Sequence, residues 1–313
     1  MDQSIPQHFD GTRFFNPDAP QVRGLLDLLR WKRTSRAERS PRFIADVTPS
    51  KPPVRVGAEE IRVTMINHST LLIQQAGWNI LTDPIWSERA SPLKAFGPRR
   101  HRAPGVRLED LPPIDTVLLS HNHYDHLDPA TLRALLGRHR PHFVVPIGLG
   151  QWLRSRNMVP VHELDWGESW RDRGTVIHSV PALHFSGRGL FDRNQTLWCG
   201  YVIEAARRIS YFAGDTGFGN HFAWIRERFG PPSVAFLPIG AYEPRWFMSP
   251  VHMAPDEAAR AHQILGARTS IAIHHGTFQL ADESIDAPKK RLRECAAADS
   301  FLVLENGQSV TLA

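Results

Sequence analysis

Short apolar segments separated by turn residues run along the chain from about residue 56 onward. The segments IRVTMI, TLLIQQ and WNILTD predict strands at residues 61–66, 70–75 and 78–83, with a turn at Ala76-Gly77. The next apolar runs, VLLS and FVVPI, alternate with two helical patterns, DPATLRALLGRHR and GQWLRSRN. Strands followed by alternating strands and helices predict an α/β domain.

The second half of the chain makes the same change from strands to alternating strands and helices, without a sequence repeat. Strands are predicted by VHEL, SWRDR, TVIHSVPA, LWCGYVIEA, RRISYFAG, VAFLPI and SIAIHH, and helices by HFAWIRERF, APDEAARAHQIL and APKKRLRECAAA. The chain closes with FLVLE and QSVTL around Asn306-Gly307, which predicts a hairpin. We expect an αββα sandwich, two mixed β-sheets flanked by helices, although this order also fits other α/β folds.

Residues 1–55 differ from the rest and are expected to form an N-terminal arm, with one catalytic domain over residues 56–313. The segment QVRGLLDLLRW predicts a short amphipathic helix, and RWKRTSRAERSPR adds six basic residues and one acid. Apolar residues beside a basic cluster suit an anionic bilayer, so residues 20–42 are a candidate membrane-docking or lid segment. The alternative is an arm strapped across the domain with its leucines packed on the core.

Composition narrows the class of protein. The 313 residues are 42% hydrophobic and 22% charged, as in a globular protein, and the net charge is +5. The two cysteines, Cys199 and Cys295, exclude a disulfide scaffold and a cysteine zinc knot. The apolar runs are too short to cross a bilayer and the N-terminus lacks a signal-peptide core, so we expect a cytoplasmic protein, at most peripheral to a membrane.

The segment SHNHYDHLD, residues 120–128, places His121, His123, Asp125 and His126 in one loop between a predicted strand and a helix. Imidazole and carboxylate groups are ligands that suit zinc, and also iron or manganese. One metal ion could bind His121 and His123, and a second could bind Asp125 and His126. Neither pair completes a site, so further ligands are needed.

Three candidates lie at the ends of other predicted strands. They are His184 after TVIHSVPA, Asp215 in the GDTG segment, and His274 in the HHGT segment. A fold brings side chains from distant sequence positions together at strand ends, so we expect these residues to complete the metal centre.

The HxHxDH pattern followed by isolated His, Asp and His resembles the metallo-β-lactamase superfamily of binuclear metallohydrolases. The segments LTDPIW, SPLKAFGPRR, LPPIDTVLLSHNHYDHLD, ELDWGE, FAGDTGF, PIGAYEPRWFM and AIHHGTF resemble, in order, the N-acyl-phosphatidylethanolamine-hydrolysing phospholipase D family. The early segment HFDGTRFFNP resembles the leader of that family. The resemblance implies an αββα metallo-β-lactamase fold with two Zn²⁺ ions at its edge, Fe or Mn being alternatives.

The resemblance also implies roles for individual residues. The first metal site falls on His121, His123 and His184, the second on Asp125, His126 and His274, and Asp215 bridges them. Asp83 is expected to accept a hydrogen bond from the histidine loop, with His68 nearby. His252 is placed beside the substrate phosphate, and Asp125, Asp215 and His252 form the catalytic set. Tyr242, Glu243 and Arg245 are candidate headgroup contacts, or else an ion pair that holds their own loop.

The implied reaction is hydrolysis of a phosphodiester in an N-acyl-phosphatidylethanolamine-like phospholipid, giving an N-acylethanolamine and a phosphatidic acid. A homodimer is implied as well, and no nucleic-acid partner is expected. One alternative is a hydrolase of the same fold acting on a lactone, a small phosphodiester or nucleic acid. Another is a non-catalytic lipid-binding protein with a relic metal site. His275 departs from the family pattern, and so does the segment PALHFSGR around His184. Both are expected near the substrate cleft.

Overall fold

In the computed structural model, residues 7–17, 22–93, 95–189, 191–295 and 300–312 are described, and these form two seven-stranded sheets. The first sheet has the order β14 (Ser309–Leu312), β1 (Ile61–Asn67), β2 (Thr70–Gln75), β3 (Trp78–Thr82), β4 (Thr116–Leu118), β5 (His142–Pro146), β6 (Val161–Leu164). The second has the order β13 (Phe301–Leu302), β12 (Thr269–Ile273), β11 (Val234–Pro238), β10 (Arg208–Phe212), β9 (Gly200–Ala205), β8 (Thr175–Val180), β7 (Ser169–Asp172).

Both sheets are mixed and share one layout. Strands β14, β1, β2 and β3 pair antiparallel, whereas β3 to β6 pair parallel. In the second sheet β7 to β10 pair antiparallel and β10 to β13 parallel. This matches the two mixed sheets expected from the sequence.

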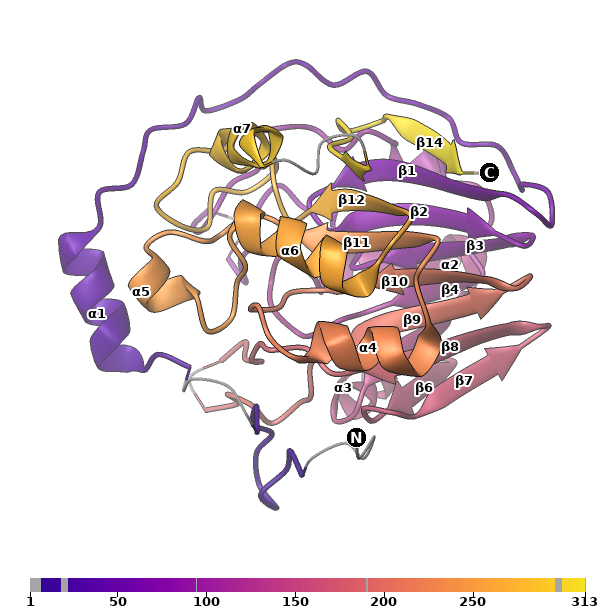
Figure 1. Cartoon of the computed structure of the whole chain (residues 1–313), viewed down its shortest axis with the longest axis horizontal. Helices are drawn as coiled ribbons and strands as arrows, with labels where there is room; N and C mark the ends of the chain where they lie inside the picture. The colour runs from indigo at the N-terminus through magenta and orange to yellow at the C-terminus, as the bar shows by residue number, and fades with distance from the viewer. Residues whose placement is uncertain (1–6, 18–21, 94, 190, 296–299, 313) are drawn as a thin grey trace.

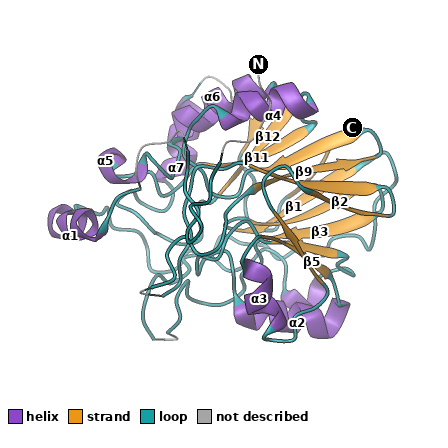
Figure 2. Cartoon of the chain, turned by 90° about the horizontal axis from the view of Figure 1, so that it is seen from below, coloured by secondary structure: helices purple, strands orange, loops and turns teal. Residues whose placement is uncertain are grey.

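Helices cover the outer faces of both sheets (Figure 2). The helices are α1 (Leu25–Thr34), η1 (a 3₁₀ helix, Leu108–Asp110), α2 (Pro129–His139), α3 (Leu149–Arg154), α4 (His221–Phe229), α5 (Arg245–Met248), α6 (Pro255–Leu265) and α7 (Ala287–Glu294). Apolar residues of α2 and α3 pack on the first sheet, and those of α4, α6 and α7 pack on the second. A third cluster, which includes Ile73, Tyr201 and Phe236, fills the space between the sheets. The αββα expectation is confirmed.

One local prediction was wrong. FLVLE and QSVTL do not form a hairpin, because β13 pairs with β12 in the second sheet and β14 pairs with β1 in the first. The turn at Asn306-Gly307 instead carries the chain between the sheets, where the Gly307 amide donates to the carbonyl of Met65. The sequence signal marked a real turn and could not show which strands it joins. Helix α7 ends at Glu294, and residues 296–298 of the predicted helix lie outside the described part.

The N-terminal arm crosses the surface before the first strand (Figure 1). Helix α1 lies beside α5, with Trp31 buried and packed against Phe247, and the amphipathic helix predicted there is present. The following segment is extended, and its backbone bonds to the domain at Glu38, Ile44 and Ser50. Residues 20 and 21 of the predicted docking segment lie outside the described part. Among the described residues, no helix is both long and apolar enough to cross a membrane.

Candidate metal centre

The candidate ligands gather where strands of one direction end. Strands β1 and β3 both run antiparallel to β2, and β4 runs parallel to β3. Strands β8 and β10 likewise share one direction with β12. The residues that follow these strands are His68, Asp83, His121, His184, Asp215 and His274. One edge of the sandwich thus receives side chains from both sheets.

Three of these residues have a left-handed backbone, which only glycine adopts freely. The φ angles are +49° for His68, +36° for Asp83 and +58° for His274. Such a conformation costs about 1–3 kcal/mol for a residue with a side chain and persists where the surroundings enforce it. The cost is concentrated where three strands deliver polar groups to one point.

The first ligand group consists of His121, His123 and His184. The Nε2 atom of His121 lies 2.8 Å from Nδ1 of His123, and Nε2 of His184 lies 3.2 Å from that same Nδ1. Burial and the neighbouring His126 hold the pKa of His121 well below its ordinary value, and burial lowers that of His123 to about 4. Burial likewise holds the pKa of His184 well below its ordinary value, so all three rings are neutral at pH 7 and offer lone pairs to a cation.

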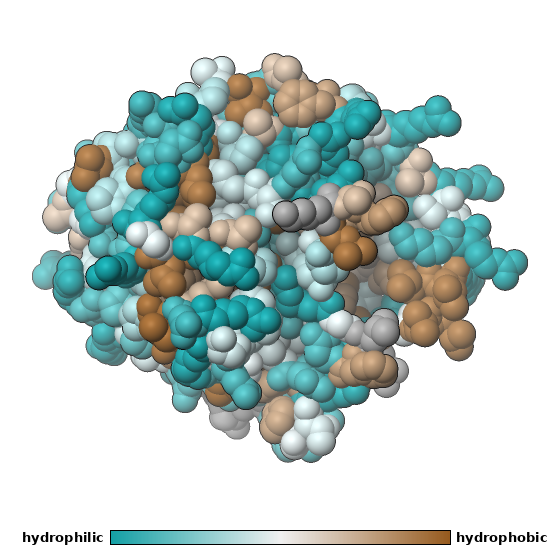
Figure 3. Space-filling view, turned by 180° about the vertical axis from the view of Figure 1, so that it is seen from behind, coloured by the Kyte–Doolittle hydropathy of each residue, from teal (hydrophilic) through white to brown (hydrophobic). Residues whose placement is uncertain are grey.

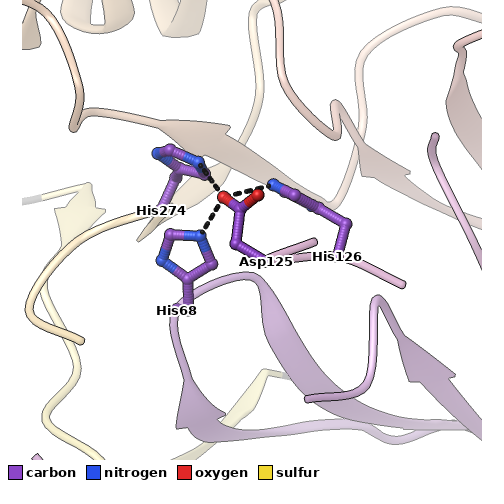
Figure 4. A group of neighbouring side chains, drawn as sticks. All are labelled: His68, Asp125, His126 and His274. Carbon is purple, nitrogen blue, oxygen red and sulfur yellow. Dashed lines mark hydrogen bonds and ion pairs between the residues drawn. The ribbon is translucent and has the colours of Figure 1, made fainter. Parts of the chain in front are cut away.

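The second group surrounds the carboxylate of Asp125, as Figure 4 shows. Its Oδ2 atom lies 3.2 Å from Nε2 of His126, 3.3 Å from Nε2 of His274 and 3.0 Å from Nε2 of His68. Burial alone would raise the pKa of Asp125, but His126 and the hydrogen bonds from His274 and His68 hold it well below its ordinary value. The carboxylate is ionised and fits a hard cation.

Asp215 lies between the two groups. Its Oδ2 atom is 3.2 Å from His126 Nε2 and 3.1 Å from His274 Nε2, and 3.7 Å from His184 Nε2. Its Oδ1 atom is buried without a hydrogen-bond partner among the described residues. An orphaned carboxylate oxygen amid converging imidazole nitrogens fits a pair of divalent cations, and this donor set suits zinc, iron or manganese.

Asp83 fixes the orientation of the histidine loop through hydrogen bonds. Its carboxylate is fully buried and accepts hydrogen bonds from the Ser120 amide at 2.7 Å, the Ser120 hydroxyl at 2.6 Å and His126 Nδ1 at 2.7 Å. Burial alone would lower the pKa of His126, but Asp215, Asp125 and Asp83 raise it well above its ordinary value. The hydrogen bond to Asp83 keeps a proton on Nδ1, so a cation that replaces the Nε2 proton would bind His126 through Nε2.

The N-terminal leader holds the His184 loop in place. Asn16 donates from Nδ2 to the carbonyl of His184 at 2.8 Å, and Trp198 Nε1 donates to Asn16 Oδ1 at 3.0 Å. The Nδ1 atom of His184 faces the carbonyl of Val251 at 3.1 Å. The sequence did not predict that the leader orients this histidine, because the two segments lie far apart in the chain.

A cavity of about 520 Å³ opens onto the ligand cluster. His123, Asp125, Asp215, His252 and His274 form its floor. The walls are largely apolar and come from α1, α5 and the loops around them, with Leu28, Trp31, Phe185, Phe247, Met248, Val251 and Leu280 among the lining residues. Arg23 and Arg193 also line it, and Arg193 donates to the carbonyl of Arg23. The sequence did not predict these walls, because they come from four segments that lie far apart in the chain.

His252 has the position that the sequence predicted beside the metals. It lines the cavity, and one of its nitrogens lies within 4.8 Å of ligand atoms of His184 and Asp215. Burial lowers its pKa to about 3, so the ring is neutral. Its Nδ1 atom is buried and lacks a hydrogen-bond partner among the described residues.

The structure does not place Tyr242, Glu243 and Arg245 at the cavity. Arg245 pairs with Glu257 at 2.7 Å and donates to the carbonyls of Tyr242 and His252. The backbone amides of Tyr242 and Glu243 donate to the carboxylate of Glu283. These residues form the ion pair and hydrogen bonds that hold their own loop, the alternative that the sequence left open. Through the bond to the His252 carbonyl, Arg245 helps to position that histidine.

The structure places His275 and the loop after His184, which both depart from the family pattern, in different surroundings. His275 is buried, lies 3.2 Å from the carbonyl of Ala272 and is absent from the cavity lining, so its expected place near the cleft was wrong. The loop after His184 does reach the cavity, through Phe185 and Arg193.

Comparisons with known proteins agree with this geometry. Residues 78–275 match the family described as the Beta-lactamase superfamily domain. An uncharacterized protein of Mycobacterium tuberculosis is 38% identical, with 97% of this chain and 83% of its own length covered. The N-acyl-phosphatidylethanolamine-hydrolyzing phospholipase D 1 of Caenorhabditis elegans is 39% identical, with 78% of this chain and 74% of its own length covered. A metallo hydrolase from Ignicoccus hospitalis superposes with a TM-score of 0.62 at 24% identity, covering 81% of this chain and 99% of that one.

Proposed function

Because this chain belongs to the β-lactamase superfamily and, within it, to the N-acyl-phosphatidylethanolamine-hydrolysing phospholipase D family, we propose that it is a binuclear zinc phosphodiesterase acting on such lipids. The products would be an N-acylethanolamine and a phosphatidic acid. One observation carries the proposal: two adjoining ligand groups form the floor of a cavity whose walls are apolar and which also holds two arginines. A phosphodiester with acyl chains has the matching chemistry.

The ligand groups assign the two ions. His121, His123 and His184 would hold one, Asp125, His126 and His274 the other, and Asp215 would touch both. Two bound Zn²⁺ ions supply Lewis acidity that lowers the pKa of water toward about 7 and attracts an anionic phosphodiester. Asp125 and Asp215 bring less negative charge to the cluster than the positive charge that two divalent ions would bring. The loaded site would therefore stay cationic.

The cavity residues bind and orient the lipid. Each methylene removed from water contributes about 0.8 kcal/mol, so an acyl chain lying along Trp31, Phe247 and Met248 would supply much of the binding free energy. Arg193 also lines the cavity and would attract the phosphate. His252, neutral and with one unpaired ring nitrogen, would hydrogen-bond either a phosphoryl oxygen or the ethanolamine oxygen as it leaves.

Helix α1 would bring the cavity to the bilayer. Leu25, Leu26 and Leu29 are 69%, 82% and 53% exposed, although Leu28 and Trp31 of the same helix face inward. In Figure 3 apolar side chains gather over this helix, with hydrophilic ones around them. Exposed leucines beside basic residues favour insertion into an anionic surface, which would place the mouth of the cavity where the substrate resides.

The test uses purified zinc-loaded protein and phosphatidylcholine vesicles that contain N-acyl-phosphatidylethanolamine, with the reaction run in ¹⁸O-labelled water. We expect both products by mass spectrometry, with ¹⁸O in phosphatidic acid and none in the N-acylethanolamine, because attack at phosphorus breaks the bond to the ethanolamine oxygen. A chelated sample should release neither product. Protein that holds two zinc ions and releases neither product would refute the proposal.

A further inference from the structure

A second groove of about 970 Å³ lies on the other side of the metal-ligand loop. Residues 122–125 line the two cavities in alternation: His123 and Asp125 line the cavity at the metal centre, whereas Asn122 and Tyr124 line this groove. The groove also runs along α2 and α3 and the loop after His184. Nothing in the proposed hydrolysis uses it.

Four arginines line the groove, and none of them makes an ion pair within the part of the chain that the structure describes. They are Arg89, Arg133, Arg156 and Arg188. The guanidinium of Arg156 lies 4.0 Å from the ring centre of Trp152, and that of Arg188 lies 4.0 Å from the ring centre of Tyr124. By contrast, the buried Arg102 outside the groove is paired with two aspartates.

The groove has two carboxylates of its own, and both are already occupied. Asp128 accepts from the backbone amides of Trp86 and Ser87, and Asp192 accepts from those of Arg188 and Gly189. Neither lies within ion-pair distance of a groove arginine. Four guanidinium groups against two carboxylates leave the lining with a net charge of +2.

We propose that this groove binds a phosphate monoester. A phosphate monoester carries a charge of about −1.5 to −2 at pH 7, which matches the lining. Planar guanidinium groups bind phosphate oxygens in bidentate fashion, which explains why arginine supplies the charge here. The same chemistry is present in a soluble phosphate ester and in the headgroup of phosphatidic acid. The inference does not rest on the hydrolysis proposed above, because the groove shares no ligand residue with the metal centre.

The groove adjoins the metal centre through Arg188. Its Nη1 donates to the carbonyls of Asn122 at 2.7 Å and Leu127 at 2.9 Å, both in the metal-ligand loop. Its Nε and Nη2 donate to no acceptor among the described residues, so they remain available to a phosphate. Arg188 therefore lines the groove and also supports the metal-ligand loop. For that reason it is left unchanged in the test.

The test compares metal-loaded wild-type protein with two double variants by calorimetric titration of inorganic phosphate. Arg133→Ala with Arg156→Ala removes two groove arginines, whereas Arg138→Ala with Arg171→Ala removes the same charge from exposed positions outside the groove. Phosphate that binds at the metals contributes equally in all three proteins. We expect the groove variant to lose about tenfold to hundredfold in affinity for one binding event, and the control variant to match wild type.

A second arm sediments the three proteins with phosphatidylcholine vesicles, with and without phosphatidic acid. Weaker phosphate binding by the groove variant supports a site for soluble phosphate esters. A defect of the groove variant seen only with phosphatidic acid supports the lipid headgroup as the source. If the groove variant matches the control variant in both arms, the proposal is overturned.

Discussion

Replacing Asp83 with asparagine should weaken one metal site and spare the other. The substitution keeps the shape of a fully buried side chain that accepts three hydrogen bonds. An amide has one acceptor oxygen, and its NH₂ group must face either the Ser120 amide or His126 Nδ1. If it faces His126, the ring accepts at Nδ1, its proton moves to Nε2, and the lone pair that would bind metal is lost.

The magnitude follows from this tautomer change. Loss of a partner that orients a ligating histidine reduces metal affinity by about 10–100-fold, or about 1.4–2.7 kcal/mol. The effect should fall on the group of Asp125, His126 and His274. The group of His121, His123 and His184 should keep its affinity, because Ser120 still lies 2.9 Å from Nδ1 of His121.

The assay is competition for zinc against a graded series of chelators, with metal content measured after each step. Asp115→Asn is the matched control, because Asp115 also accepts a backbone amide, that of Asn79, but lies just before β4, at the end of the strand away from the ligands. We expect the Asp83 variant to lose one ion well before the other. If it held both ions as tightly as the Asp115 variant does, the argument from the His126 tautomer would be refuted.

Three further predictions concern Asp215, Gly240 and helix α1. Asp215→Asn should weaken both ions and abolish phosphodiester cleavage; full turnover with two ions bound would contradict the bridging role. Gly240→Ala should lower metal content, because an added Cβ would lie 2.0 Å from the carbonyl oxygen of His274, and a zinc assay of the folded variant checks this. Leu26→Glu should reduce flotation with anionic vesicles while cleavage of a detergent-dispersed substrate persists; unchanged flotation would argue against docking through α1.

The sequence predicted which His and Asp side chains gather at this edge, because their chemistry is local. The segment SHNHYDHLD packs four ligand side chains into one loop, a density that few structural roles explain. His184, Asp215 and His274 follow apolar runs, and parallel strands in one sheet end at the same edge. Residue type and strand order together were therefore enough to expect these side chains near one another.

The cavity walls and the loop contacts could not be predicted in this way. Arg245 has the residue type of a headgroup contact, but its partner is Glu257, and only the tertiary structure shows this ion pair between α5 and α6. The leucines of α1 are one residue type, so the sequence does not show which of them are exposed and which are covered. The position of the helix beside α5 decides this.

The sequence by itself determined the strand and helix pattern, the loop that carries the ligands, and the chemistry they offer, because each depends on residue type and short spacing. Tertiary structure decided that β13 and β14 join different sheets, that Asn16 supports His184, and that unpaired arginines share one groove. The physical reason is that these features depend on contacts between segments far apart in the chain. Pairing, burial and unmatched charge are set by which surfaces meet, and hydrophobic periodicity does not encode that choice.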